Sequence, residues 1–522
     1  MSDAQAEVEK LGSGSSEDSG SHHAEVFERP AGWRGYYQHP ITQVSMLGFV
    51  CFMCPGMFNA LTGLGGWWSS QQYGPGQFQR YLVRDLCVFR VLFGVMTVVV
   101  GSSSINNVLG SRLTLMLGTW GYSLYIASFL AVNIHPGAGA FVVTAGAILG
   151  VCAAFLWTAQ GSLMMSYPTE AQKGMFISIF WAIFNLGGVV GSAVAFGNNF
   201  KSEANSGKGY VGNGTYVGFL ILTLIGVFLP LFMVDPNKMI RTDGTRVNTV
   251  RHPSWKTEFF SLFVALKTDP WIILLFPMFI ASNYFYTWQF NDYNGAIFNI
   301  RTRGLNNFMY WTSQIFGSIF IGYFVLDQKR VRRRVRAFYG WVLVFFMIFV
   351  VHVWAYFYQK TYTRAEEAVA TAYKIDFSDK NYPAHVWLMI FYGFLDSMWQ
   401  TYAYWLMGAM SNDPAKLAVF AGFCAYLTSN RKYEFDTDQE THTDKSLQSA
   451  GAAGVWAADG ASLPYMNIFL STWCLTVAGM IFAAPMVYLR VTDHTEIEDE
   501  ALMQMAGVER IEPPVAATSQ KA

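Results

Sequence analysis

Long apolar stretches of about 20 residues, separated by short polar segments, recur along the whole chain. A helix needs about 20 residues to cross the ~30 Å hydrocarbon layer of a bilayer, where the chain itself must satisfy every backbone N–H and C=O group. The pattern therefore predicts an all-α polytopic membrane protein with about 12 transmembrane helices. We expect them at residues 41–64, 86–105, 113–133, 140–164, 175–196, 216–234, 270–290, 305–326, 338–358, 385–410, 416–458 (interrupted) and 465–489.

The polar segments divide these helices into two sets of six. The sequence predicts an N-terminal tail at 1–40, a six-helix half at 41–234, a central loop at 235–269, a second six-helix half at 270–489 and a C-terminal tail at 490–522. Residues 1–29 are rich in Ser, Glu and His and lack an apolar run, which predicts a disordered tail without a cleaved signal peptide.

The positive charges indicate the orientation of these helices. Lys and Arg are concentrated at 329–336 and in the central loop, so both loops are expected in the cytosol, and an even number of helices places both termini there too. Asn213, in Asn213-Gly214-Thr215, is a glycosylation candidate that the same topology places outside the cytosol; a chance sequon is the alternative. We expect a multi-pass protein of the plasma membrane or of an endomembrane or vacuole.

Composition supports the membrane assignment and excludes several functions. Hydrophobic residues make up 52% of the chain and charged residues 13%, with a formal net charge of +0, so no nucleic-acid partner is expected. The six cysteines fall in or beside apolar segments, which predicts neither a disulfide framework nor a metal site. No motif for nucleotide hydrolysis or proteolysis is present, so we expect no enzyme activity and no cofactor.

A short motif recurs once in each half. Gly101 and Asn106 follow the second predicted helix, and Gly322 and Asp327 follow the eighth, with the same spacing. The glycine allows close helix approach, and the Asn or Asp can cap or pair at a cytoplasmic gate, to which we also assign Arg112. Repeated halves joined by a long loop are typical of the major facilitator architecture, in which the halves rock about a midplane site.

Several long segments resemble the Unc-93-like family of the major facilitator superfamily. They include MFNALTGLGG (57–66), GSRLTLMLGTWGYSLYIASF (110–129), MMSYPTEAQKG (164–174), FPMFIASNYFYTWQFN (276–291) and FYGFLDSMWQTYAYWLMGAMSND (391–413). The resemblance implies the twelve-helix fold. It leaves the activity open, since the family includes transporter-like proteins, a channel regulatory subunit and a receptor-escorting protein.

Two segments depart from the family pattern. Residues 67–100 differ from the small-residue second helix of the family and contain Arg90, which costs at least ~2.5 kcal/mol inside an apolar helix. An altered reading frame and local divergence both account for this segment. Residues 428–446 form a charged insert that splits the eleventh helix into two halves, each too short to span. A retained intervening segment or a loop between re-entrant half-helices explains it.

The candidate site lies where the first, fourth, seventh and tenth helices meet. Asp396 is central in the tenth helix, with Trp399 and Gln400 at i+3 and i+4 on the same face. A carboxylate in a membrane helix must be protonated, hydrated or paired, so Asp396 is either a coupling group or a structural acid bonded to a neighbour. The other candidates are polar or aromatic residues of the remaining helices, each with interhelical bonding as its alternative role: Asn59, Trp157, Gln160, Asn283, Tyr286 and Gln289.

Two functions follow from these observations. The first is a secondary transporter of a small solute or ion, which works by alternating access with Asp396 as the coupling group. The second is a non-transporting membrane adaptor that regulates or escorts a channel or receptor. In either case the lipid bilayer is a partner, and the adaptor requires a membrane-protein partner as well.

Overall fold

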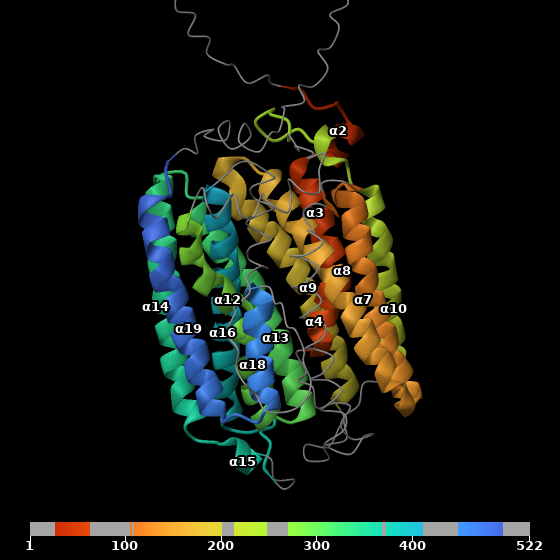
Figure 1. Cartoon of the computed structure of the whole chain (residues 1–522), viewed down its shortest axis with the longest axis vertical. Coiled ribbons are helices and arrows are strands. Elements are labelled where there is room, and N and C mark those ends of the chain that lie inside the picture. Colours follow the sequence, from red (N-terminus) through yellow and green to blue (C-terminus); the bar gives the residue numbers. More distant parts are fainter. Residues whose placement is uncertain are drawn as a thin grey trace, which may run out of the picture.

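The computed structural model describes residues 27–62, 105–106, 109–200, 213–247, 270–367, 372–410 and 447–493. Within these ranges the secondary structure is helical apart from two isolated β-bridges, and nine helices are long and apolar enough to cross a membrane. Figure 1 shows them side by side, with α14 and α19 along one edge and α7 and α10 along the other. The short helices α2 and α15 mark opposite ends of the bundle.

The N-terminal helices agree with the sequence prediction. The first span consists of α3 (Pro40–Cys51), a π-helical turn η1 (Phe52–Gly56) and α4 (Met57–Thr62). Pro55 lies inside η1, where its missing N–H interrupts the α-helical pattern. The elements that follow are α7 (Ser111–Ile134), α8 (Gly139–Ser166), α9 (Lys173–Asn199), α10 (Asn213–Phe228) and η4 (Leu229–Phe232), with α2 (Trp33–Tyr37) preceding the first span.

The C-terminal helices also follow the predicted order, but several are compound. The seventh span joins η6 (Pro270–Leu275), α12 (Phe276–Tyr284) and the π-helix η7 (Thr287–Gly295). The eighth span joins α13 (Ile300–Ile319) and the π-helix η8 (Phe320–Leu326). The rest are α14 (Arg333–Gln359), α15 (Arg364–Glu367), α16 (Tyr382–Met410), α18 (Leu447–Gly460) and α19 (Tyr465–Leu489).

Several sequence predictions fall outside the described residues. These are the helix at 86–105 up to its last residue, with Gly101 and Arg90, the first half of the predicted eleventh helix at 416–427, the insert at 428–446, and most of the two tails. The central loop is described up to residue 247. The second half of the predicted eleventh helix, at 447–458, is present as α18.

Contacts at the helix ends place the predicted loops consistently. At the α2 end, the Tyr37 hydroxyl donates to the carbonyl of Phe232, and Arg241 Nε donates to the carbonyl of Ser166 at 2.9 Å. At the α15 end, Asn133 Nδ2 donates to Asn213 Oδ1 at 2.5 Å. The central loop and the sequon therefore lie at opposite ends of the bundle, as the predicted topology requires.

Among the described residues, the two sets of helices contact each other mainly through α9. In the described part of the chain, the close packing between the sets is that of α9 against α13, α16 and η8. Small residues allow this approach: a Cβ atom at Gly188 would lie 2.6 Å from the ring of Trp311, and one at Gly304 would lie 3.0 Å from the backbone of Phe196. Close approach through small residues is typical of membrane helix interfaces.

Candidate functional site

Asp396 lies in the middle of α16 with 2% of its surface exposed. Its Oδ2 atom is within hydrogen-bond distance of three donors: Tyr286 hydroxyl at 2.8 Å, Tyr310 hydroxyl at 3.0 Å and Gln314 Nε2 at 2.6 Å. Its Oδ1 atom is buried and has no hydrogen-bond partner among the described residues. We call Asp396, Tyr286, Tyr310 and Gln314 the Asp396 cluster.

The Tyr310 hydroxyl has two acceptors for its single proton. It lies 3.0 Å from Asp396 Oδ2 and 2.8 Å from Gln289 Oε1. Because a tyrosine hydroxyl donates one hydrogen bond at a time, Tyr310 can donate to the carboxylate or to the amide. Its choice therefore depends on the charge of Asp396.

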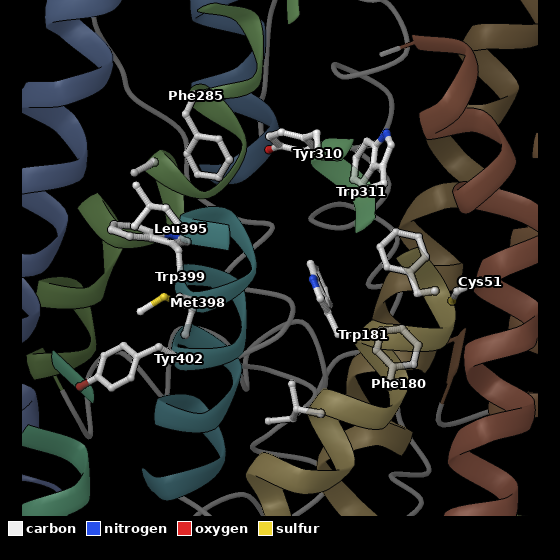
Figure 2. Packing of buried hydrophobic residues seen from close by; sticks show 14 of the residues in the cluster. Cys51, Phe180, Trp181, Phe285, Tyr310, Trp311, Leu395, Met398, Trp399 and Tyr402 are labelled. Atoms are coloured by element: carbon white, nitrogen blue, oxygen red, sulfur yellow. The ribbon is translucent and has the colours of Figure 1, made fainter. Parts of the chain in front are cut away.

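The Asp396 cluster extends into the N-terminal set of helices through Trp181 of α9. Its indole Nε1 donates to Gln314 Oε1 at 3.0 Å, while Gln314 Nε2 donates to Asp396. Figure 2 shows Trp181 extending from α9 toward α16, with Tyr310 and Trp311 close by. A hydrogen-bonded chain thus connects α9, α13 and α16 near the centre of the molecule.

Trp399 and Gln400, predicted to stand beside the acid, both bond to α12. Trp399 Nε1 donates to Ser282 Oγ at 3.0 Å, and Gln400 Nε2 donates to the carbonyl of Ser282 at 2.7 Å. In Figure 2, Trp399 lies on the side of α16 away from Trp181. These two side chains join α16 to α12, and only Gln400 also lies close to the Asp396 carboxyl.

The remaining predicted residues divide between the two sets of helices. Tyr286 and Gln289 belong to the hydrogen bonds around Asp396, and Asn283 lies half-buried on α12. Asn59 lies half-buried on α4, Trp157 packs edge to face on Phe184, and Gln160 Nε2 lies 3.3 Å from Met164 Sδ. The hydrogen bonds of the Asp396 cluster connect instead to α9, the seventh span and α13.

Asp327, from the predicted gate motif, caps a helix of the other set. Its Oδ1 accepts from the Gly174 N–H at 3.0 Å and its Oδ2 from the Met175 N–H at 2.5 Å, in the first turn of α9. The N-cap residue Gln172 makes no side-chain cap of its own. Burial raises the pKa of Asp327 to about 6, and the two backbone N–H groups and nearby Arg336 oppose this increase.

Other members of the predicted gate motif have different surroundings. Gly322 lies against α9: a Cβ atom there would be 2.6 Å from the carbonyl oxygen of Gly174. Arg112 donates to the carbonyl of Leu231 and so ties α7 to η4, and Asn106 is buried. At the same end, Lys173 Nζ donates to the carbonyl of Gly408, which adds a second contact between α9 and the C-terminal set.

Comparison with known proteins decides the family. The sequence profile of the ion channel regulatory protein UNC-93 matches residues 85–430. An UNC93-like protein of Schizosaccharomyces pombe is 43% identical over 89% of this chain and 85% of its own length. The chain belongs to the UNC-93 family. UNC93-like protein 1 of Arabidopsis thaliana is 36% identical over 89% of the chain and 93% of its own length.

Solved structures show that this UNC-93 family protein has the major facilitator fold. The proton:xylose symporter XylE of E. coli matches with a TM-score of 0.56 at 12% identity, over 90% of this chain and 99% of its own. The human organic anion transporter MFSD10 matches with a TM-score of 0.53 at 10% identity, over 85% and 98%. The predicted family and fold are confirmed.

Sequence reasoning missed three residues at or beside Asp396: Trp181, Tyr310 and Gln314. Two of them belong to a polar stripe with a spacing of four on α13, formed by Asn306, Tyr310, Gln314 and Ser318, all with 0% exposure. Polar residues spaced in this way lie on one helix face, which in a membrane helix must point into the protein. That stripe was the available signal, whereas Trp181 is one of many aromatic residues.

Proposed function

We propose that this UNC-93 family protein is a secondary transporter that moves a small solute or ion by alternating access, with Asp396 as its proton-coupling group. The observation that carries the proposal is that the Tyr310 hydroxyl lies within hydrogen-bond distance of two acceptors, Asp396 Oδ2 and Gln289 Oε1. A buried carboxylate with three donors on one oxygen and none on the other is arranged to change its bonding when it takes up a proton.

The charge of Asp396 determines which helices are held together. When Asp396 is ionised, the donors on Oδ2 form charge-assisted hydrogen bonds, each worth about 1.5–3 kcal/mol. When Asp396 is neutral, it attracts these donors less, and Tyr310 can donate to Gln289 of η7 instead. The hydrogen bond from Gln314 to Asp396 then weakens. The link from Asp396 through Gln314 to Trp181 of α9 weakens with it.

This change acts at the junction between the two sets of helices. Because α9 carries the close contacts between the sets in the described part of the chain, weakening its link to α13 lowers the cost of moving one set relative to the other. The caps that Asp327 supplies at the α2 end must also break for the sets to separate there. We assign the α2 end to the cytosol, with both termini, in the plasma membrane or an endomembrane.

Transport by purified protein tests the proposal. The full chain is reconstituted in liposomes with an inward proton gradient and supplied with radiolabelled sugars, organic anions and amino acids. We expect gradient-dependent uptake of at least one probe, and a loss of at least 10-fold on Asp396→Asn, equivalent to about 1.4 kcal/mol or more. Asp243→Asn, at an exposed carboxylate of the α2 end, is the matched control and should keep full uptake.

Two results would contradict coupling through Asp396. One is uptake by Asp396→Asn that remains as fast as wild type and as dependent on the proton gradient. The other is an absence of gradient-driven uptake across the probe panel. Tyr310→Phe separates the two parts of the mechanism, because it removes the hydroxyl and keeps the ring: gradient dependence should weaken while binding of the transported probe persists.

A second function is favoured by the family description, which is that of an ion channel regulatory protein. In that case this chain would act as an adaptor that holds a membrane-protein partner. Affinity purification in mild detergent tests it: a partner recovered at a fixed ratio, with no solute uptake in liposomes, would favour the adaptor over the transporter.

A further inference from the structure

A second buried acid lies at the α15 end of the C-terminal set, away from Asp396. Asp292 of the π-helix η7 is fully buried, with 0% exposure. Asp459 of α18 approaches it, and Arg364 of α15 stands between them. Arg364 NH2 lies 2.6 Å from Asp459 Oδ1 and 3.4 Å from Asp292 Oδ1.

The two carboxyl groups differ strongly in the hydrogen bonds that their oxygens accept. Asp459 accepts from Arg364 on Oδ1 and from Asn291 Nδ2 on Oδ2 at 2.9 Å. Asp292 Oδ1 has only the longer contact to Arg364, and its Oδ2 is buried without a hydrogen-bond donor among the described residues. The two carboxyls lie within hydrogen-bonding range of each other. If both were ionised, two carboxylates would share the single guanidinium of Arg364, and Asp292 Oδ2 would have no donor in the described part of the chain.

The neighbouring groups already have other partners. Tyr362 donates its hydroxyl proton to the backbone carbonyl of Asp292 at 3.0 Å, and Arg364 covers the ring of Tyr465, 4.2 Å from its centroid. Glu367 of α15 is paired with Lys374, and Arg303 of α13 donates Nε to the carbonyl of Phe298. One guanidinium thus remains for two carboxyls, and the pair carries one excess negative charge.

We propose that Asp292 and Asp459 share one proton, so that the pair is a proton-binding site of its own at the α15 end. A proton on Asp292 lets its carboxyl donate to Asp459, which removes the excess charge and supplies the missing donor. A metal ion fits this site poorly, because Ca²⁺ takes six to eight oxygen ligands and Arg364 already places a positive charge there. The proposal does not depend on the role of Asp396.

The site is reached from one side. The side chains of Asp459 and Arg364 are 16% and 20% exposed, whereas that of Asp292 is 1% exposed, so within the described ranges the pair is open to solvent only on the side of Asp459 and Arg364. Release of the proton leaves two facing carboxylates on different elements, which weakens the contact between α18 and η7. Binding and release of the proton at this pair would therefore control the strength of the contact between α18 and η7.

Infrared spectroscopy of the purified full chain tests the proposal. At neutral pH we expect a protonated-carboxyl signal that Asp292→Asn removes, with a loss equivalent to one carboxyl group. Asp376→Asn is the matched control: this carboxylate lies at the same end, and both its oxygens accept from Arg301 at 2.7 Å, so it should contribute no such signal. All spectra are repeated in an Asp396→Asn background, which separates this proton from one on Asp396.

Each outcome decides the proposal. A protonated-carboxyl signal that persists at full strength in folded Asp292→Asn overturns it, and so does the absence of any such signal from the Asp396→Asn protein. If Asp292→Asn does not fold, Asp459→Asn replaces it. Its new amide can donate to Asp292, so the signal should disappear, whereas a signal that remains would show that the two carboxyls do not share the proton.

Discussion

At the scale of single residues, Asp327, Asp396 and Asp292 differ in how many hydrogen bonds their carboxyl oxygens accept. Asp327 binds a backbone N–H with each oxygen, at the end of a helix. Asp396 gathers three donors on one oxygen, and Asp292 has one long contact. The first arrangement holds the end of a helix, and the other two leave one carboxyl oxygen without a hydrogen-bond donor among the described residues.

Asp327 is expected to make the stability of the protein depend on pH. Burial raises its pKa to about 6 from the ordinary 3.8. Between these values the folded protein binds more protons than the unfolded chain, so the free energy of unfolding decreases as the pH rises from about 4 to about 6 and then levels off. Asp327→Asn should lack this decrease, which is at most about 3 kcal/mol.

Thermal unfolding in detergent across this pH range measures the effect. Asp243→Asn, an exposed carboxylate in a turn at the same end, should keep the wild-type profile. The assignment to Asp327 fails if Asp327→Asn keeps the wild-type decrease between pH 4 and 6.

At the scale of elements, the crossing of α9 with η8 depends on the absence of side chains. Gly322 lies where a Cβ atom would be 1.9 Å from Ser178 Oγ, and the Ser178 hydroxyl donates to the carbonyl of Ser318 at 2.7 Å. The same approach brings Asp327 to the N-terminus of α9. Helix approach and helix capping are thus parts of one contact, since the cap forms only when the helices are close.

Gly322→Ala is therefore expected to destabilise the protein by about 1–3 kcal/mol, the usual cost of overpacking. Alanine otherwise favours a helix over glycine by about 1 kcal/mol. Gly218→Ala on α10, where nothing lies within 4 Å of the new Cβ atom, should leave the stability unchanged or raise it. Thermal unfolding of both variants in detergent provides the comparison. If Gly322→Ala and Gly218→Ala change the stability equally, the crossing of α9 with η8 tolerates a side chain at position 322.

Helix eleven gives a second prediction at this scale. The described part, α18, has 14 residues and is about 21 Å long, which is too short to span the hydrocarbon layer. Deleting residues 428–446 should join it to the preceding apolar segment and increase the yield of monodisperse protein. Size-exclusion chromatography in detergent measures this. A lower yield than that of the full chain would show that the insert is a genuine structural loop.

At the scale of the whole molecule, the ends of the bundle carry different chemistry. The α2 end holds the central loop and, next to Asp327, the basic loop, whereas the α15 end holds Asn213 and the buried acid pair. Because positive charge is retained on the cytosolic side during insertion, we expect the α2 end to face the cytosol.

Labelling with a membrane-impermeant maleimide tests this orientation. In intact cells or sealed vesicles, a cysteine introduced by Gly214→Cys should react from outside the cytosol, and one introduced by Lys329→Cys only after permeabilisation. The unsubstituted chain controls for Cys474, which is exposed in the structure. Reaction of both sites from the same side would overturn the twelve-helix topology.

The sequence by itself determined the membrane fold and the order of the described spans, because each span must bury its own backbone polar groups and so has a characteristic length. The family followed separately, from the resemblance of several long segments. The sequence also made Asp396 a candidate, since a carboxylate in an apolar helix is costly wherever it points. Only the tertiary structure decided which groups meet that carboxylate. Tyr310 and Gln314 contact it from α13, and Trp399 turns instead to Ser282, because helix rotation and crossing set these contacts. The approach of Asp459 to Asp292 likewise depends on packing between distant segments, which periodicity along the chain does not specify.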